Sequence, residues 1–211
     1  AFGSYTARRD VQPSMKFEHL LTRLVFNIKG MGTSKPENVY VQSIKVKSKT
    51  TGKLVFVYAA DANKGIQWDG NDEGTLLSLQ ERKGNVMQPL TDKTYYASAA
   101  DAETPTAVGE ALLVEPGVET YDIEVVVKQE IDESGNTVPV AQQTATYELT
   151  LKASDVTKNG TDAGITTFAA STSYNVTIAV YGIKKIELTA ELGEWINGGD
   201  ININPDDTFT E

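Results

Sequence analysis

The chain has 211 residues, of which 40% are hydrophobic and 23% are charged, a balance typical of a globular protein with its own core. Its 29 acidic and 19 basic residues give a net charge of -10, which disfavours binding to nucleic acid or to an anionic membrane surface. The absence of cysteine excludes disulfides, thiolate zinc sites and a cysteine nucleophile.

Taken in chain order, most predicted elements are strands, because apolar and polar residues alternate along them. The expected strands cover residues 20–28, 39–47, 54–58, 121–129, 147–151, 174–181 and 186–192, with additional strands near Leu76 and Leu112. Turn-forming residues separate them, for example at Thr51-Gly52 and at Asn159-Gly160. Two short segments, 18–23 and 76–82, are the candidates for a helical turn or helix.

One pair of strands is specified strongly enough to predict their connection. Residues 121–129 place apolar side chains at alternate positions, and residues 147–151 repeat this pattern. A polar stretch, residues 132–136, lies between them and contains Gly135. We therefore predict a long hairpin, and for the whole chain an all-β fold, an antiparallel β-sandwich of about seven to nine strands with little helix.

No break rich in proline, glycine or serine divides the chain, so one domain is predicted over residues 15–198. Residues 1–14 are interpreted as a lead-in or processed segment, and residues 199–211 as a tail or a candidate donor strand. No apolar run is long enough to span a membrane, so no transmembrane segment is predicted. The chain begins at Ala1, and we expect any export signal or lipid anchor to lie upstream.

A search for catalytic motifs gives a negative prediction: no catalytic residue, no metal site and no cofactor. His19 is the only histidine, so a multi-histidine metal site is impossible, and a packed imidazole is the preferred interpretation. Residues 69–74 partly imitate a calcium loop. Gln80 stands at the twelfth position, where an EF-hand needs glutamate, so a surface turn is favoured.

Aromatic residues suggest one alternative function. Trp68, together with Tyr95 or Tyr96, could present flat faces on which sugar rings stack, as in a carbohydrate-binding module of a surface polysaccharide system. The competing interpretation for each aromatic residue is core packing, which is favoured for Trp195. A secreted hydrolase is a third class, and it would require two carboxylates facing each other across a cleft.

Two stretches resemble a known family. "FEHLLTRLVFNI", residues 17–28, and "TFAASTSYNVTIAVYGIKKIELTAELGEWINGGDI", residues 167–201, are similar to parts of the C-terminal half of the Bacteroidales fimbrillins, the type V pilins. The second stretch has a phenylalanine before a small loop, a Tyr-Asn-Val-Thr-Ile strand, and an alternating strand that ends in tryptophan and glycines. The "FAAS" loop departs from the lysine- and glycine-containing loop expected there.

The resemblance implies a non-catalytic subunit of a surface pilus, or a cell-surface adhesin, located at the outer membrane in a fimbrium. Such a protein is exported as a lipoprotein precursor and matured by an arginine-specific protease. Removal of an N-terminal strand then leaves a groove that a strand of a neighbouring subunit fills. The implied partners are other pilin subunits, and a host or bacterial surface protein or glycan.

This resemblance suggests roles for residues at both ends of the chain. In an extended strand after a Gly198-Gly199 hinge, Ile201 and Ile203 would project the same way, as the side chains of a donor strand must. The alternatives are an acidic tail, or a strand paired within its own domain. Arg8-Arg9 is a candidate processing site, with an ordinary polar lead-in as the alternative.

Overall fold

A computed structural model describes residues 14–15, 18–30, 39–55, 65–90, 104–132, 134–182, 185–193 and 201–202. The chain divides into two units. Leu20–Glu194 form the larger unit, and Ala1–His19 together with Trp195–Glu211 form the smaller one. Each is described by itself below.

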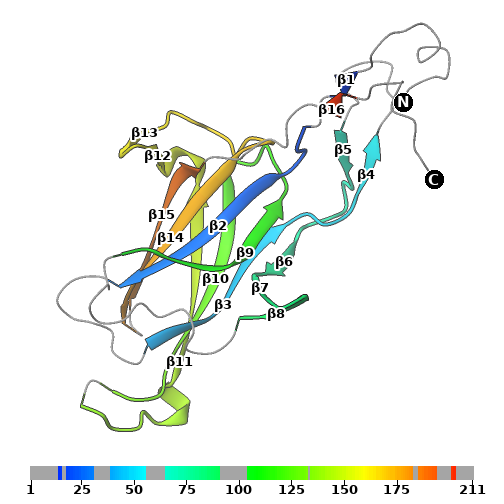
Figure 1. Ribbon diagram of the computed structural model, residues 1–211. Coiled ribbons are helices and arrows are strands. Elements are labelled where there is room, and N and C mark those ends of the chain that lie inside the picture. Colours follow the sequence, from blue (N-terminus) through cyan, green and yellow to red (C-terminus); the bar gives the residue numbers. More distant parts are fainter. Residues whose placement is uncertain are drawn as a thin grey trace, which may run out of the picture. The chain divides into compact units, whose positions relative to one another are not determined.

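The larger unit is a β-sandwich, and its smaller layer is a four-stranded antiparallel sheet (Figure 1). The strand order is β11 (Thr144–Lys152), β10 (Thr120–Gln129), β3 (Val39–Ser48) and β6 (Thr75–Ser78). The register shifts between Val126 and Val127 where β10 pairs with β3, so a bulge interrupts that ladder. β10 and β11 pair without any shift.

The second layer is a six-stranded sheet in the order β13 (Thr161–Asp162), β12 (Val156–Lys158), β15 (Lys185–Gly193), β14 (Ser173–Gly182), β2 (Thr22–Gly30) and β9 (Thr106–Val114). β14 and β2 run parallel side by side in the interior of this sheet, from Ser173↔Arg23 to Val180↔Gly30 (Figure 1). β12 and β15 also pair in parallel, over two residue pairs. All other ladders in this sheet are antiparallel.

Short elements complete the described chain. Two ribbons pair β4 (Gly52–Val55) with β5 (Gly65–Trp68), and β7 (Gln80–Lys83) with β8 (Val86–Pro89). Two 3-10 turns, η2 (Val140–Gln142) and η3 (Ala153–Asp155), are the helical elements of the described residues. In the smaller unit, β1 (Ser14–Met15) pairs with β16 (Ile201–Asn202).

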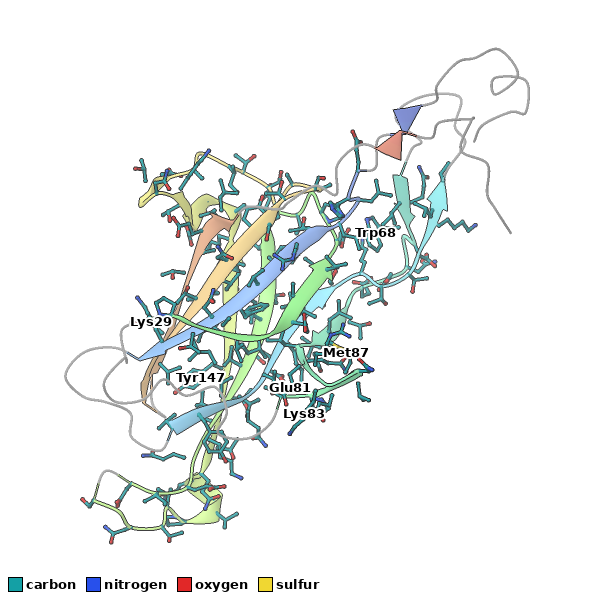
Figure 2. The ribbon with its side chains drawn as sticks, in the orientation of Figure 1. Lys29, Trp68, Glu81, Lys83, Met87 and Tyr147 are labelled. Atoms are coloured by element: carbon teal, nitrogen blue, oxygen red, sulfur yellow. The ribbon has the colours of Figure 1, made fainter. Side chains whose placement is uncertain are left out.

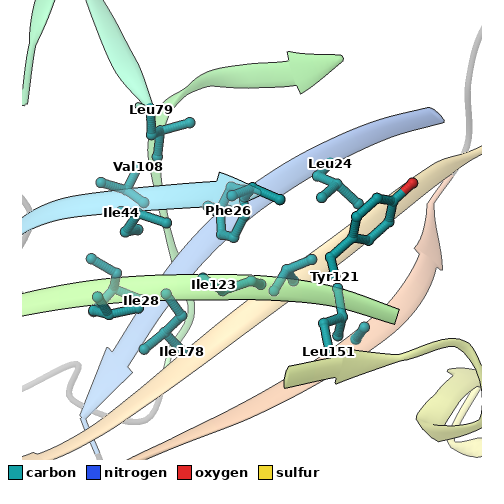
Figure 3. Close-up of a cluster of buried hydrophobic side chains, with 14 of the residues drawn as sticks. Leu24, Phe26, Ile28, Ile44, Leu79, Val108, Tyr121, Ile123, Leu151 and Ile178 are labelled. Atoms are coloured by element: carbon teal, nitrogen blue, oxygen red, sulfur yellow. The ribbon is translucent and has the colours of Figure 1, made fainter. Parts of the chain in front are cut away.

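The core lies between the two sheets because each long strand turns alternate side chains inward. β2 shows this most regularly: buried and half-buried residues alternate along all nine of its positions. Figure 3 shows side chains of this core from both layers, including Phe26, Ile44, Ile123 and Ile178, each no more than 1% exposed. Burying each such side chain stabilises the fold by about 1.5–3 kcal/mol.

The predicted all-β sandwich is confirmed, and so is the hairpin of β10 and β11, whose ladder runs from Thr120↔Lys152 to Lys128↔Thr144. The two parallel pairings in the six-stranded sheet are an addition to the predicted antiparallel pattern. Residues 56–58 of the predicted strand 54–58 lie outside the described residues; β4 covers the rest.

Both helix candidates were wrong. β2 begins at Thr22, inside the candidate turn 18–23. Segment 76–82 consists of parts of β6 and β7, joined at Leu79, whose backbone N–H donates to the carbonyl oxygen of Ile44 at 2.8 Å. Apolar residues at 77 and 79 face the core with the period of a strand, and pairing with β3 outweighs any local preference for helix.

Candidate functional site

The terminal segments pair with each other in the smaller unit. β1 and β16 run antiparallel, with Ser14 opposite Asn202 and Met15 opposite Ile201. One of the two candidate donor residues therefore lies in a strand pair formed within its own chain. Ile203, the Gly198-Gly199 hinge and the candidate processing site Arg8-Arg9 lie outside the described residues.

The segment that carries the strongest family resemblance enters the sandwich through Phe168, which is fully buried. The backbone N–H of Phe168 donates to the carbonyl oxygen of Val118 at 2.9 Å, and its own carbonyl oxygen accepts from the N–H of Gly117 at 2.7 Å. The buried Thr22 hydroxyl donates to the carbonyl oxygen of Ala169 at 2.9 Å. These bonds fix the 165–172 loop between β2 and the start of β10.

Two buried tyrosines flank Phe168. The Tyr121 ring lies 4.7 Å from the Phe168 ring, centroid to centroid, and its hydroxyl donates to the carbonyl oxygen of Glu115. The ring of Tyr174, which belongs to β14, lies edge-on to the Phe168 ring. Burial raises the pKa of both tyrosines above the ordinary value, because it disfavours the charged phenolate. This cluster is a packing element of the sandwich.

The predicted surface turn at residues 69–74 is confirmed. The Asp72 carboxylate accepts hydrogen bonds from the N–H groups of Thr50, Thr51 and Gly74 at 2.7, 2.8 and 2.9 Å. These bonds favour the charged carboxylate and lower the pKa of Asp72. Its oxygens thus hold the turn against the end of β3. Among the described residues, no group of acidic or histidine side chains is arranged to hold a metal ion.

The candidate stacking residue Trp68 ends β5, where it is half-buried and pairs with Gly52 of β4. Gly52 sits in a tight position, since a Cβ there would lie 2.9 Å from the carbonyl oxygen of Gln67. Tyr95 and Tyr96 lie outside the described residues, as does Trp195. His19, which precedes β2, is exposed, so the expectation that its imidazole is packed was wrong.

A groove of about 610 Å³ lies on the outer face of the four-stranded sheet, and sequence reasoning missed it. Its lining residues include Lys47, Leu76, Asp122, Glu124 and Glu148. Glu124 is opposite Glu148 across the β10–β11 ladder, and the Lys45 Nζ atom lies 2.6 Å from the Glu124 Oε1 atom. The outward positions of the predicted hairpin were a signal that could have located this face.

None of the protein-family models matches the chain, and no curated protein matches it. Among solved structures, it is similar to a proposed cell adhesion protein from Bacteroides uniformis, with 14% identity and a TM-score of 0.46. A fimbrilin from Porphyromonas gingivalis has 13% identity and a TM-score of 0.43. A proposed cell adhesion protein from Bacteroides fragilis has 12% identity and a TM-score of 0.37.

The matched region covers 85% of this chain in all three comparisons. It covers 52%, 59% and 47% of the three other chains, respectively, so this chain spans about half of their length. No helix in the described part of the chain is long and apolar enough to cross a lipid bilayer.

Proposed function

We propose that the protein is a non-catalytic, fimbrillin-like pilus subunit or cell-surface adhesin that assembles by addition of a β-strand between subunits. The observation that carries this proposal is the place of the segment that resembles the fimbrillins. Phe168 of that segment fills the core, and β14 and β15, which follow it, form the middle of the six-stranded sheet. The resemblance therefore lies in the framework of the fold.

Strand addition needs an incoming strand and an open sheet edge with apolar surface beside it. β16, with Ile201, is the candidate incoming strand, and it would have to leave β1 in order to enter a neighbour. A candidate receiving edge is that of β15. Among the described residues, β12 pairs with β15 at Ala190 and Glu191 only, which leaves the edge from Lys185 to Thr189 without a partner strand.

On this proposal the protein acts at the cell surface, in a fimbrium, after export as a lipoprotein precursor and cleavage by an arginine-specific protease. Arg8-Arg9 is the candidate cleavage site in this chain. Its partners would be other pilin subunits. For an adhesin they would include a surface protein or glycan.

Native mass spectrometry of the longest available precursor tests this proposal, before and after limited cleavage with an arginine-specific protease. A variant that ends at Gly199 is run in parallel. We expect a ladder of heat-resistant oligomers after cleavage, and its loss in the truncated variant. If the cleaved protein forms no such ladder, assembly by this strand is refuted.

A glycan-binding assay separates the proposal from the carbohydrate-binding alternative. We expect wild type and Trp68→Ala to give the same binding profile. Loss of glycan affinity in Trp68→Ala alone, with the fold unchanged by circular dichroism, would instead favour the carbohydrate-binding module.

A further inference from the structure

The four end strands of the two sheets differ in how well they are protected against pairing with another chain. Strands that are short or bulged resist such pairing. β13 has two residues and β6 has four. β9 has nine, but its register with β2 shifts between Leu24 and Phe26, and Gly109 adopts a positive φ of 63° there. None of these three strands presents a long regular edge.

β11 is the exception. It has nine residues and pairs with β10 from end to end with no register shift. Within the described part of the chain, no strand pairs with its other edge. Successive backbone groups of a strand point to alternate sides, so every second N–H and C=O of β11 points to this open edge.

The inner row of β11 is also incompletely covered. Ala145, Tyr147 and Leu149 pack against the core but are only half-buried (Figure 2 labels Tyr147). The residues opposite them on β10, Val127, Val125 and Ile123, are at most 1% exposed. Apolar surface therefore continues to the open edge, where another strand would bury more of it.

We propose that β11 pairs antiparallel with β11 of a second copy of this chain, about a two-fold axis, joining two four-stranded sheets into one continuous sheet. A pairing that keeps the inner residues on the inner face matches even-numbered positions with even-numbered ones. Three central registers meet this condition, with Tyr147, Glu148 or Leu149 on the axis.

The charges on the outer face make one of these registers more favourable than the other two. With Glu148 on the axis, the two copies of this carboxylate would lie directly opposite each other, which is unfavourable. With Tyr147 or Leu149 on the axis, the two carboxylates would be diagonal neighbours instead. Only the Leu149 register also places Glu148 diagonal to Lys152 of the second copy, an attractive pair that the two-fold axis repeats. This register is therefore the expected one.

The same charges explain why the second copy is the partner. Glu148 lies opposite Glu124 in its own sheet, and Lys45 pairs with Glu124. Neither Glu148 nor Lys152 has an ionic partner among the described residues. Each would gain one across the two-fold axis. β15, whose edge is the candidate receiving edge under the proposed function, also approaches β11. The pairing proposed here uses residues of β11 alone, so the inference does not rest on the proposed function.

Sedimentation equilibrium of the uncleaved full chain over a range of concentrations tests this dimer. We expect Glu148→Lys and Lys152→Glu each to raise the dimer Kd by about tenfold, because each change turns two attractive pairs into repulsive ones. The double variant, Glu148→Lys with Lys152→Glu, is expected to restore the wild-type Kd. Lys83→Glu on β7 repeats one charge change away from β11 and is expected to leave the Kd unchanged.

Circular dichroism melts recorded at concentrations where the protein is monomeric check that each variant folds. The Glu148→Lys substitution places a cation opposite Glu124 in the same sheet, so the monomer is expected to keep its stability. A wild-type chain that stays monomeric at millimolar concentration overturns the proposal. So does a double variant that is no tighter than the singles.

Discussion

Tyr174 contacts both Phe168 and the residue that follows it. Its ring packs edge-on against the Phe168 ring, with centroids 5.0 Å apart and planes at 81°, and its hydroxyl accepts a hydrogen bond from the N–H of Ala169 at 3.0 Å. Tyr174, the second residue of β14, thus contacts the loop that precedes its own strand. The aromatic contact lies within the segment that resembles the fimbrillins, and it ties the loop around Phe168 to β14.

Replacing Phe168 by alanine is expected to lower the free energy of unfolding by about 3–5 kcal/mol, because a fully buried ring is lost and a cavity remains. Urea denaturation followed by tyrosine fluorescence measures this. Phe168→Leu serves as the control, with a smaller loss. Equal stability of the alanine variant and the wild type would show that the ring is not part of the core.

Replacing Tyr174 by phenylalanine removes the hydroxyl and keeps the ring. We expect a loss of about 0.5–1.5 kcal/mol, the usual net contribution of one hydrogen bond. Hydrogen exchange at the Ala169 amide should speed up in this variant, since its acceptor is gone. An unchanged exchange rate would contradict the bond.

Alkaline pH is expected to destabilise the protein through Tyr121. Burial raises its folded-state pKa above the ordinary value of 10.0, so the stability it contributes is fully present below pH 10. That contribution falls as the pH rises from 10 toward the folded-state pKa, because the unfolded state ionises first. Urea midpoints between pH 9 and 11 measure the decline, and Tyr121→Phe should make it shallower. An equal decline in this variant would rule out Tyr121 as its source.

Acid pH is expected to loosen the 69–74 turn through Asp72. Its pKa is lowered, so the stability it contributes is present above the ordinary value of 3.8 and is lost as the pH falls through the folded-state value. Asp72→Asn should lower the thermal midpoint at pH 7 and reduce this acid dependence. The neighbouring Glu73→Gln is the control, with no change expected. Similar effects of both substitutions would argue against a specific role for Asp72.

Gly109 is where β9 bulges toward the link between β6 and β7. A Cβ there would lie 2.8 Å from the Leu79 Cγ atom and from the carbonyl oxygen of Gln80, and φ is 63°. Gly109→Ala should therefore cost more than about 1–3 kcal/mol, the range for backbone strain alone. Gly117→Ala isolates the conformational part, since φ is 82° and no atom lies within 4 Å of its Cβ. Equal losses of stability in the two alanine variants would show that Leu79 and Gln80 shift to accommodate the Cβ at position 109.

The β10–β11 hairpin could be predicted because its signal is local: two alternating strands with a polar turn between them. The outward carboxylates of the groove follow from the same alternation once the register is known, as Glu124↔Glu148 shows. The parallel pairing of β2 with β14 could not be predicted in this way. Nothing in the neighbourhood of Arg23 specifies Ser173 as its partner; the pairing arises when both strands bury their apolar faces against the other sheet.

The terminal residues were harder to interpret. Alternation around Ile201 correctly indicates a strand, and one alternative was that this strand pairs within its own domain. Pairing with Met15 joins segments near opposite ends of the chain. Backbone hydrogen bonds are nearly independent of side-chain identity, so periodicity predicts that a strand forms without naming its partner.

The parallel pair formed by β2 and β14 inside the six-stranded sheet also limits when this sheet can fold. Arg23 and Ser173, which are hydrogen-bonded to each other, are 150 residues apart. During synthesis β2 therefore emerges long before β14, its parallel neighbour, exists. Proteins dominated by contacts between residues far apart in the sequence fold in milliseconds to seconds. The ladder between β2 and β14 therefore cannot form until both strands have been synthesised, and folding of the six-stranded sheet must follow the synthesis of β14.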